Sequence, residues 1–230
     1  TSMLAEDLKP NRLEAAKDVA AEFINGRPND NIGITLFAGE TFTQCPLTVD
    51  HAVLLDMIHN IKCGLITDGT AVGMGIANAV TRLKDSKAKS KVIILLTDGT
   101  NNKGDISPMT AAEIAKSFGI RVYTIGVGTN GMAPYPYPVG NTVQYVSMPV
   151  EIDEKTLTEI AGTTDGNYFR ATSNSKLKEV YEEIDKLEKT KLNVKEYSKR
   201  DEEYQWFALA AFLCVLLEVL LRNSILKKIP

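Results

Sequence analysis

Two short and almost wholly apolar runs, Lys91–Leu96 and Arg121–Val127, constrain the fold of this chain more than any other feature. Continuous apolar runs of this length are typical of strands that are covered on both faces, as in parallel sheets between layers of helices. Helical periodicity flanks them, with helices predicted over residues 71–84 and 107–118. Strands that alternate with helices predict an α/β fold with a doubly wound, mostly parallel sheet of Rossmann-like type.

Segments on either side of these strands and helices predict further elements. Residues 12–25 carry apolar side chains at helical spacing and predict an amphipathic helix, with Arg12 and Lys17 off its apolar face. Residues 32–47 predict a hairpin that adds one antiparallel strand to the edge of the sheet. Residues 129–149 are rich in Gly and Pro and predict a loop.

The most apolar stretch of the chain lies near its C-terminal end, where Glu218 is the single charged residue between Trp206 and Leu221. About 20 apolar residues are enough to cross a bilayer as a helix, so a transmembrane helix is predicted, with a buried core helix as the alternative. Basic residues after this segment favour a cytoplasmic tail and place the folded domain outside. The predicted boundaries are a domain over 1–190, a linker over 191–203, the transmembrane helix over 204–225 and a basic tail over 226–230.

Composition excludes several classes of protein. The chain has 230 residues, of which 44% are hydrophobic, and a formal net charge of −3. The hydrophobic fraction argues against disorder as the main state, and the weakly acidic balance argues against nucleic-acid binding, which needs a basic face. Cys45, Cys63 and Cys214 match neither a disulfide scaffold nor a thiolate zinc site. Cys45 and Cys63 could pair in an oxidising compartment, and free buried thiols are the default expectation.

Two loops bring oxygen-bearing side chains to the predicted sheet. Thr97–Asn102 follows the first buried strand, and Thr67–Thr70 leads into a helix. Ligands of open parallel sheets lie beyond the carboxyl ends of the strands. Hydroxyl and carboxylate oxygens suit a hard cation such as Mg²⁺ or Mn²⁺, and neither loop has the His or Cys that zinc prefers. Ordinary turn chemistry is the alternative for each loop taken alone.

Neither loop carries the residues that a catalytic function would need. Both loops contain Asp-Gly-Thr, as haloacid-dehalogenase-type phosphatases do, but Ile66 and Leu96 stand where those enzymes carry the nucleophilic Asp. His51 and His59 lie on one short predicted helix and are expected on its surface. The sequence therefore favours a protein that is not an enzyme, with a metal-dependent hydrolase or phosphatase as the alternative.

Three motifs, in order along the chain, resemble the von Willebrand factor type A domain: Ser2–Lys17, Asp68–Gly73 and Ile94–Gly99. Within that family, the segment Pro149–Lys155 and the apolar C-terminal stretch are similar to those of Bat-type aerotolerance membrane proteins such as BatA.

The resemblance implies a metal-ion-dependent adhesion site, with Ser2, Thr70 and Asp98 as the metal ligands. The Asp and the first Ser of the family's leading motif, with the central first strand that carries them, would precede Thr1. The chain is therefore expected to be an N-terminally truncated piece of this fold that lacks its central strand and folds poorly alone. Mg²⁺ or Mn²⁺ binding is expected to be weak or absent in it.

The resemblance also implies a function. In such domains an acidic side chain of a partner protein completes the coordination of the metal, so we expect a membrane-anchored interaction module. The loops around the site would set specificity, through Thr100, Asn101, Asn102, Tyr135 and Tyr137. Expected partners are membrane or periplasmic proteins, including sibling Bat proteins, with a MoxR-type ATPase nearby. The expected location is the bacterial inner membrane, in a complex related to aerotolerance or stress, and a structural membrane protein with a vestigial metal site is a further alternative.

Overall fold

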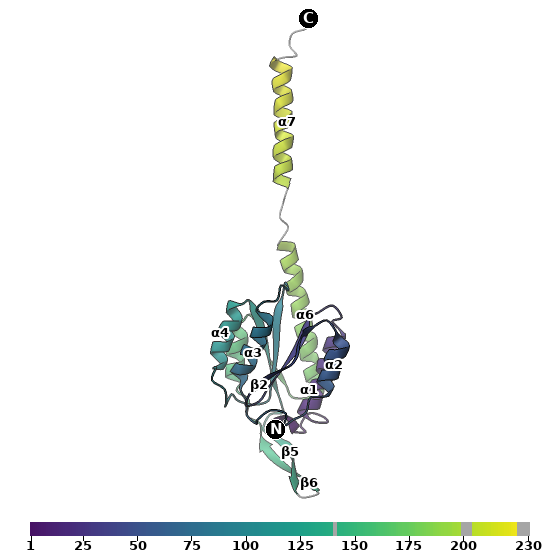
Figure 1. Ribbon diagram of the computed structural model, residues 1–230, viewed down its shortest axis with the longest axis vertical. Helices are drawn as coiled ribbons and strands as arrows, with labels where there is room; N and C mark the ends of the chain where they lie inside the picture. Colours follow the sequence, from purple (N-terminus) through teal and green to yellow (C-terminus); the bar gives the residue numbers. More distant parts are fainter. Residues whose placement is uncertain (140–141, 199–203, 225–230) are drawn as a thin grey trace. The chain divides into compact units, whose positions relative to one another are not determined.

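The computed structural model describes residues 1–139, 142–198 and 204–224, and the chain divides into two compact units, Thr1–Glu188 and Lys189–Pro230 (Figure 1). The elements are η1 (Ser2–Leu4), α1 (Arg12–Asn25), β1 (Ile32–Phe37), β2 (Thr41–Thr48), α2 (His51–His59), α3 (Val72–Leu83), β3 (Lys91–Thr97), α4 (Pro108–Ser117), β4 (Ile120–Val127), β5 (Met132–Val139), β6 (Thr142–Pro149), α5 (Glu154–Thr163), β7 (Tyr168–Ala171), α6 (Asn174–Ser198) and α7 (Tyr204–Ser224).

The two apolar runs form adjacent parallel strands. β3, β4 and β7 make a three-stranded sheet in that order, and both neighbouring pairs are parallel. Because side chains alternate across a strand, Ile93 and Leu95 join one core cluster while Ile94 and Leu96 pack against another on the opposite face. The prediction of an α/β fold with a mostly parallel sheet is confirmed.

Helices cover both faces of this sheet. One face packs against apolar side chains of α3, α4 and α5, among them Ile76, Ala112 and Ile160. The other packs against α1 and the first part of α6, through Val19 and Leu177. Figure 1 shows α3 and α4 on one side of the domain and α1 on the other. Because the strands are parallel, their carboxyl ends lie together at one end of the sheet, between the two helical layers.

The hairpin of β1 and β2 differs from its prediction. Its strands pair antiparallel, but they form a separate two-stranded sheet and do not extend the sheet of β3, β4 and β7 within the described residues. The hairpin instead packs with α2 around Cys45, Leu54 and Ile58. No strand of the described chain lies between the two sheets to bond with both, and the predicted absence of a central strand stays a prediction.

The predicted loop over 129–149 is wrong, because β5 and β6 form an antiparallel ribbon there. Pro134, Pro136 and Pro138 suggested a loop, since proline cannot donate to a strand ladder. They occupy alternate positions, however, so all three can lie on the side of the strand that makes no bonds to β6. The ribbon projects from the end of the domain at which the N-terminus lies (Figure 1).

The second unit contains the end of α6 and the helix α7. α6 continues to Ser198. In the part of the chain that the structure describes, no helix combines the length and apolar content needed to span a membrane, so the predicted transmembrane helix over 204–225 is not confirmed. Residues 199–203, Ile225 and the tail 226–230 lie outside the described residues.

Candidate metal site

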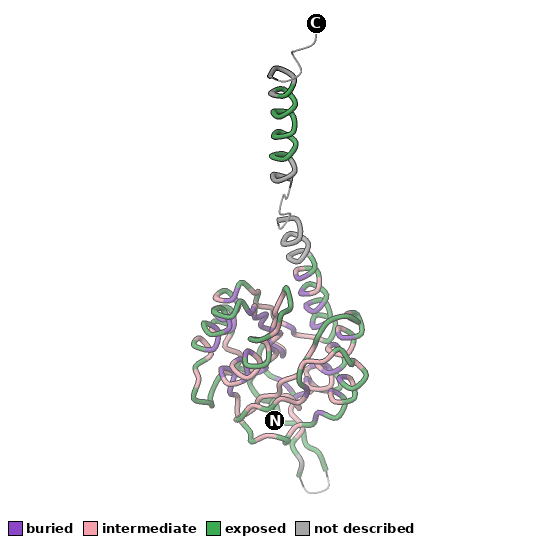
Figure 2. Tube along the Cα trace, turned by 45° about the horizontal axis from the view of Figure 1, so that its top comes forward, coloured by how far each residue is buried: buried purple, intermediate pink, exposed green. Residues whose placement is uncertain are grey.

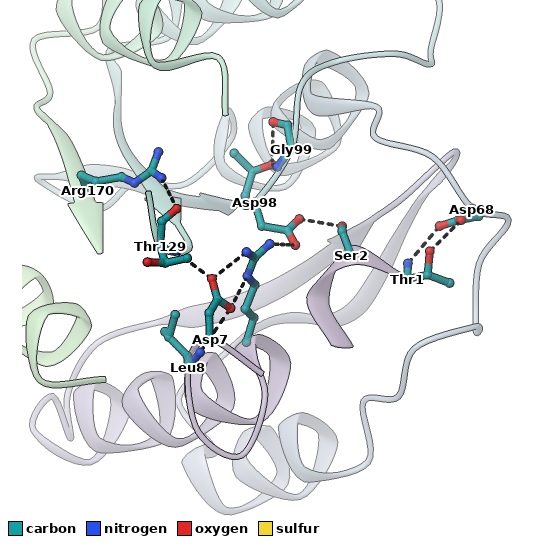
Figure 3. A network of polar contacts seen from close by, with 11 residues as sticks. Thr1, Ser2, Asp7, Leu8, Asp68, Asp98, Gly99, Thr129 and Arg170 are labelled. Atoms are coloured by element: carbon teal, nitrogen blue, oxygen red, sulfur yellow. Dashed lines mark hydrogen bonds and ion pairs between the residues drawn. The ribbon is translucent and has the colours of Figure 1, made fainter. Parts of the chain in front are cut away.

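Asp98 stands directly after β3, at the edge where the sheet is open. Its side chain is buried, and its Oδ1 accepts a hydrogen bond of 2.8 Å from the hydroxyl of Ser2 in η1 (Figure 3). The two residues come from opposite halves of the domain sequence, and the fold brings them together because η1 lies across the end of the strand. Two of the three predicted metal ligands are therefore in direct contact.

The other carboxylate oxygen of Asp98 is bound by Arg12, the first residue of α1. Arg12 Nη1 donates to Asp98 Oδ2 over 2.9 Å, and only 3% of the Arg12 side chain is exposed. A cation at the N-terminus of a helix is unfavourable, because the helix dipole presents positive charge there. The ion pair with Asp98 offsets that cost and fixes the orientation of the carboxylate.

Asp7 holds the remaining face of the same guanidinium. Arg12 Nε and Nη2 donate to the two oxygens of Asp7 over 2.8 Å and 2.7 Å, a bidentate geometry that favours arginine over lysine. The backbone amide of Thr129 donates to Asp7 as well, over 2.7 Å. Gly128 makes room for the guanidinium, since a Cβ there would lie 2.7 Å from Arg12 Nη2. The loop after β4 is thereby attached to the start of α1.

The charges of this cluster stabilise one another. Burial of Asp7 raises the pKa of its carboxyl, but hydrogen bonds from Arg12 and the Thr129 amide outweigh burial and leave that pKa below its ordinary value. Burial likewise lowers the pKa of Arg12, and its bonds to Asp7 and Asp98 outweigh burial and raise it. Asp7 and Arg12 are thus both charged at neutral pH, and the Arg12 guanidinium bonds Asp7 and Asp98 together.

Thr70, the third predicted ligand, lies beside the residue that follows Asp98. A Cβ placed on Gly99 would come within 3.3 Å of Thr70 Oγ1, so glycine lets this hydroxyl approach the strand end. Nearby, the Thr1 hydroxyl donates to Asp68 over 2.8 Å (Figure 3). The loops that carry Ser2, Thr70 and Asp98 therefore converge on one edge of the sheet.

Two of the residues predicted to contact a partner hold the Thr70 loop in place. Asn102 Oδ1 accepts a hydrogen bond of 2.9 Å from the Thr70 amide, and Asn101 Oδ1 accepts one of 2.8 Å from the Val72 amide. Thr100 is half-buried beside them. Tyr135 and Tyr137 lie elsewhere, on β5, where Tyr137 is exposed and Tyr135 half-buried.

The donor chemistry of the three predicted ligands fits a hard divalent cation, because all three offer oxygen. The fit is limited in charge, since Asp98 is the only carboxylate among them and Arg12 neutralises it. The described residues contain no group of three or more His, Cys, Asp or Glu side chains that could hold a metal. The site can therefore present oxygen ligands to a cation but supplies little negative charge.

The sequence patterns did not indicate Asp7 and Arg12 as parts of this site. Helical periodicity predicted Arg12 and Lys17 off the apolar face of the helix, whereas both are buried, and Lys17 donates to the backbone oxygens of His59 and Ile61. One signal was available. An arginine at the first position of a helix opposes the dipole, and such a residue points to a nearby carboxylate partner.

A parallel sheet covered by helices on both faces, with hydroxyl and carboxylate groups gathered at the carboxyl ends of its strands, defines a doubly wound α/β domain. The chain belongs to the von Willebrand factor type A domain family, whose sequence profile matches residues 1–183.

Solved structures and curated proteins agree with this assignment. The chain is similar to the conserved hypothetical protein BatB from Bacteroides thetaiotaomicron, with 35% identity, 82% of this chain and 94% of that chain covered, and a TM-score of 0.71. It is also similar to an aerotolerance-related membrane protein from Bacteroides fragilis NCTC 9343. The identity is 31%, the match covers 80% of this chain and 92% of that chain, and the TM-score is 0.70. An uncharacterised protein of Borreliella burgdorferi is 27% identical over 220 residues, which are 95% of this chain and 64% of that protein. The chain thus spans about three fifths of the curated relatives it matches, with shares of 64%, 57% and 59%.

Proposed function

We propose that this domain is a protein-interaction module whose partner binds at the open edge of the sheet, beside Asp98. The observation that carries this proposal is the contact of 2.8 Å between Ser2 Oγ and Asp98 Oδ1, with Thr70 next to Gly99. Membership of the von Willebrand factor type A family, whose domains often mediate contacts between proteins, supports it. Similarity to BatB supports sibling Bat proteins as the class of partner.

In this proposal Ser2, Thr70 and Asp98 would hold Mg²⁺ or Mn²⁺. The cation would offer a coordination position to an acidic side chain of the partner protein. Asp7 and Arg12 orient the Asp98 carboxylate, and Asn101 and Asn102 hold the loop that carries Thr70. Because Arg12 offsets the charge of Asp98, we expect weak cation binding by this chain, and submicromolar affinity for Mg²⁺ in calorimetry would contradict that expectation.

Capture of partner proteins from membranes by the full-length protein tests the proposal. We expect capture to be lost in EDTA and restored by Mg²⁺ or Mn²⁺. Thr70→Val keeps the shape of the side chain, removes one proposed ligand and should weaken capture, whereas Thr67→Val changes an exposed hydroxyl of the same loop and should not. Capture that is equal with EDTA and with Mg²⁺ would show that the interaction does not use a cation.

Attachment to the bacterial inner membrane through α7 is the second part of the proposal, with the domain periplasmic and the tail 226–230 cytoplasmic. Large apolar side chains of α7 are exposed, including Phe212, Leu213 and Leu216. The relative from Bacteroides fragilis is named a membrane protein, which supports this location. The double substitution Leu213→Glu and Leu216→Glu should release the protein from membranes, while Leu65→Glu, at an exposed site of the other unit, should not.

The alternative of a metal-dependent hydrolase or phosphatase is not favoured by any observation on the described residues. Turnover of a generic phosphoester by the full-length protein with Mn²⁺ would separate the two functions. If the protein hydrolyses the phosphoester and Thr70→Val abolishes that hydrolysis, the site is an enzyme active site and the proposal of an interaction module is wrong.

A further inference from the structure

The ribbon of β5 and β6 is an exposed and uncharged surface. From Met132 to Val150 the sequence contains no Asp, Glu, Lys, Arg or His. Every residue of β6 is exposed, and so are large apolar side chains on both faces of the ribbon, such as Tyr145 and Val146. Figure 2 shows the described parts of this ribbon mostly as exposed chain. An exposed apolar strand edge is a surface that natural proteins usually cover or block.

Prolines block the outer edge of β5. In an antiparallel pair, residues opposite each other alternate between pairs that exchange hydrogen bonds and pairs that do not. Pro134, Pro136 and Pro138 all belong to one alternating set, and Pro149 of β6, which faces Met132, belongs to it too. Because proline has no N–H, this set is the one without bonds across the ribbon, and its backbone groups point outward. The carbonyl of Pro134 does point outward, since it accepts a hydrogen bond from the Glu6 amide.

The outer edge of β6 carries a proline only at its end, Pro149, and none from Val143 to Ser147. The residues opposite the three prolines are Ser147, Tyr145 and Val143, and their N–H and C=O groups point away from β5 for the same geometric reason. In the described chain β6 pairs only with β5. Three consecutive outward positions can therefore both donate and accept along an open strand edge.

We propose that this edge pairs with the same edge of a second copy of the chain. A two-fold axis beside Tyr145 would set Tyr145 opposite Tyr145 of the second copy, and Val143 opposite Ser147 of the second copy, all through outward-facing groups. The contact is self-complementary, as a two-fold interface requires. No like charges meet in it, because the ribbon has none. Pairing extends the two strands to a four-stranded sheet whose outer strands are the two copies of β5, each with three prolines at outward positions.

This inference is independent of the proposed cation site, since neither Ser2, Thr70 nor Asp98 takes part. One contact joins the two regions, a hydrogen bond of 3.0 Å from the Tyr145 hydroxyl to Glu6 Oε1. Every substitution at residue 145 below removes that hydroxyl bond, and a Lys there can pair with Glu6 whereas a Glu cannot, so the mixed Lys and Glu pair is compared with both like-charged pairs.

Charge exchange at residue 145 tests the pairing in the full-length protein. Two copies with different tags are expressed together, extracted in mild detergent and captured through one tag. Tyr145→Lys in both copies, or Tyr145→Glu in both, should reduce capture of the second tag by about fivefold or more, because like charges meet across the axis. Tyr145→Lys in one copy with Tyr145→Glu in the other should restore capture. Equal capture in all combinations, failure of the mixed pair to restore it, or no capture of the unsubstituted chain would overturn the proposal.

A backbone test complements the charge test. Tyr145→Pro removes an outward N–H without removing a bond between β5 and β6, and should abolish capture. Tyr145→Thr keeps the N–H and suits a strand, so it should retain more capture than Tyr145→Pro. Equal capture by the two variants would show that the backbone edge is not the contact.

Discussion

Arg12 and Asp98 form a buried ion pair of 2.9 Å that joins the start of α1 to the end of β3. The pair places a permanent cation against the carboxylate that the family resemblance assigns to a metal. The ion pair therefore contributes to the stability of the domain and also reduces the negative charge at the candidate metal site. The unfolding free energy and the cation affinity can be measured separately.

Substitution of Arg12 should destabilise the domain more than loss of a surface charge. Arg12→Ala leaves Asp7 and Asp98 buried without their partner, and removal of one member of a buried ion pair costs about 3–5 kcal/mol of unfolding free energy. Arg12→Lys keeps the charge but loses the bidentate bonds to Asp7, so its cost should be intermediate. Urea unfolding of the full-length protein measures the series.

Lys178→Ala is the matched control, because Lys178 pairs with Glu22 at the surface, where 53% and 59% of the two side chains are exposed. Such pairs contribute about 0–1 kcal/mol. An Arg12→Ala variant as stable as Lys178→Ala would contradict the role assigned to the cluster.

Acid should weaken the domain through Asp7. The pKa of Asp7 is lower in the folded protein than its ordinary value, so its stabilising contribution is present above the unfolded pKa of about 3.9 and is lost as pH falls through the folded value. Asp7→Asn removes the titration. The difference in unfolding free energy between the wild type and Asp7→Asn should be largest near neutral pH and should shrink below about pH 4. A difference that stays constant from neutral pH into acid would argue against this linkage.

Glu188 anchors α6 to the sheet. Its buried carboxylate accepts hydrogen bonds of 2.9 Å from Ser90 Oγ and 2.6 Å from the Tyr123 hydroxyl, and it pairs with Arg121. Glu188→Gln removes the charge that all three partners use and should lower unfolding free energy by about 3 kcal/mol. Glu182→Gln, at an exposed position of the same helix, should change it by less than about 0.5 kcal/mol in the same urea titration. Similar losses in the two variants would mean that Glu188 is not an anchor.

Gly73 sets the distance between α3 and the segment before α4. A Cβ on Gly73 would lie 2.0 Å from the carbonyl oxygen of Ile106, so Gly73→Ala should destabilise the domain by about 1–3 kcal/mol or more. Gly162, on α5, has open space around the same position, and Gly162→Ala should stabilise by about 0.5 kcal/mol. Thermal unfolding of both variants compares them, and a shift of the same sign in each would contradict the packing argument.

The alternation of apolar runs with helical periodicity was sufficient to predict the parallel sheet and its two helical layers. The segment from Val92 to Leu96 could be predicted as a buried strand because burial on both faces leaves no polar position in it. The family motifs then indicated Ser2, Thr70 and Asp98, and the fold gathers their loops at one edge of the sheet.

The tertiary structure decided two features that local sequence patterns could not predict, the ribbon of β5 and β6 and the burial of Arg12. The ribbon of β5 and β6 forms despite its prolines, because a ladder needs donors on only one side of each strand and the pairing partner determines which side that is. The burial of Arg12 likewise depends on Asp7 and Asp98 arriving around it, one of them from a distant part of the chain. Local sequence determines which segments become helices and strands through periodicity, whereas the burial of a charge is decided by which carboxylates the fold places beside it.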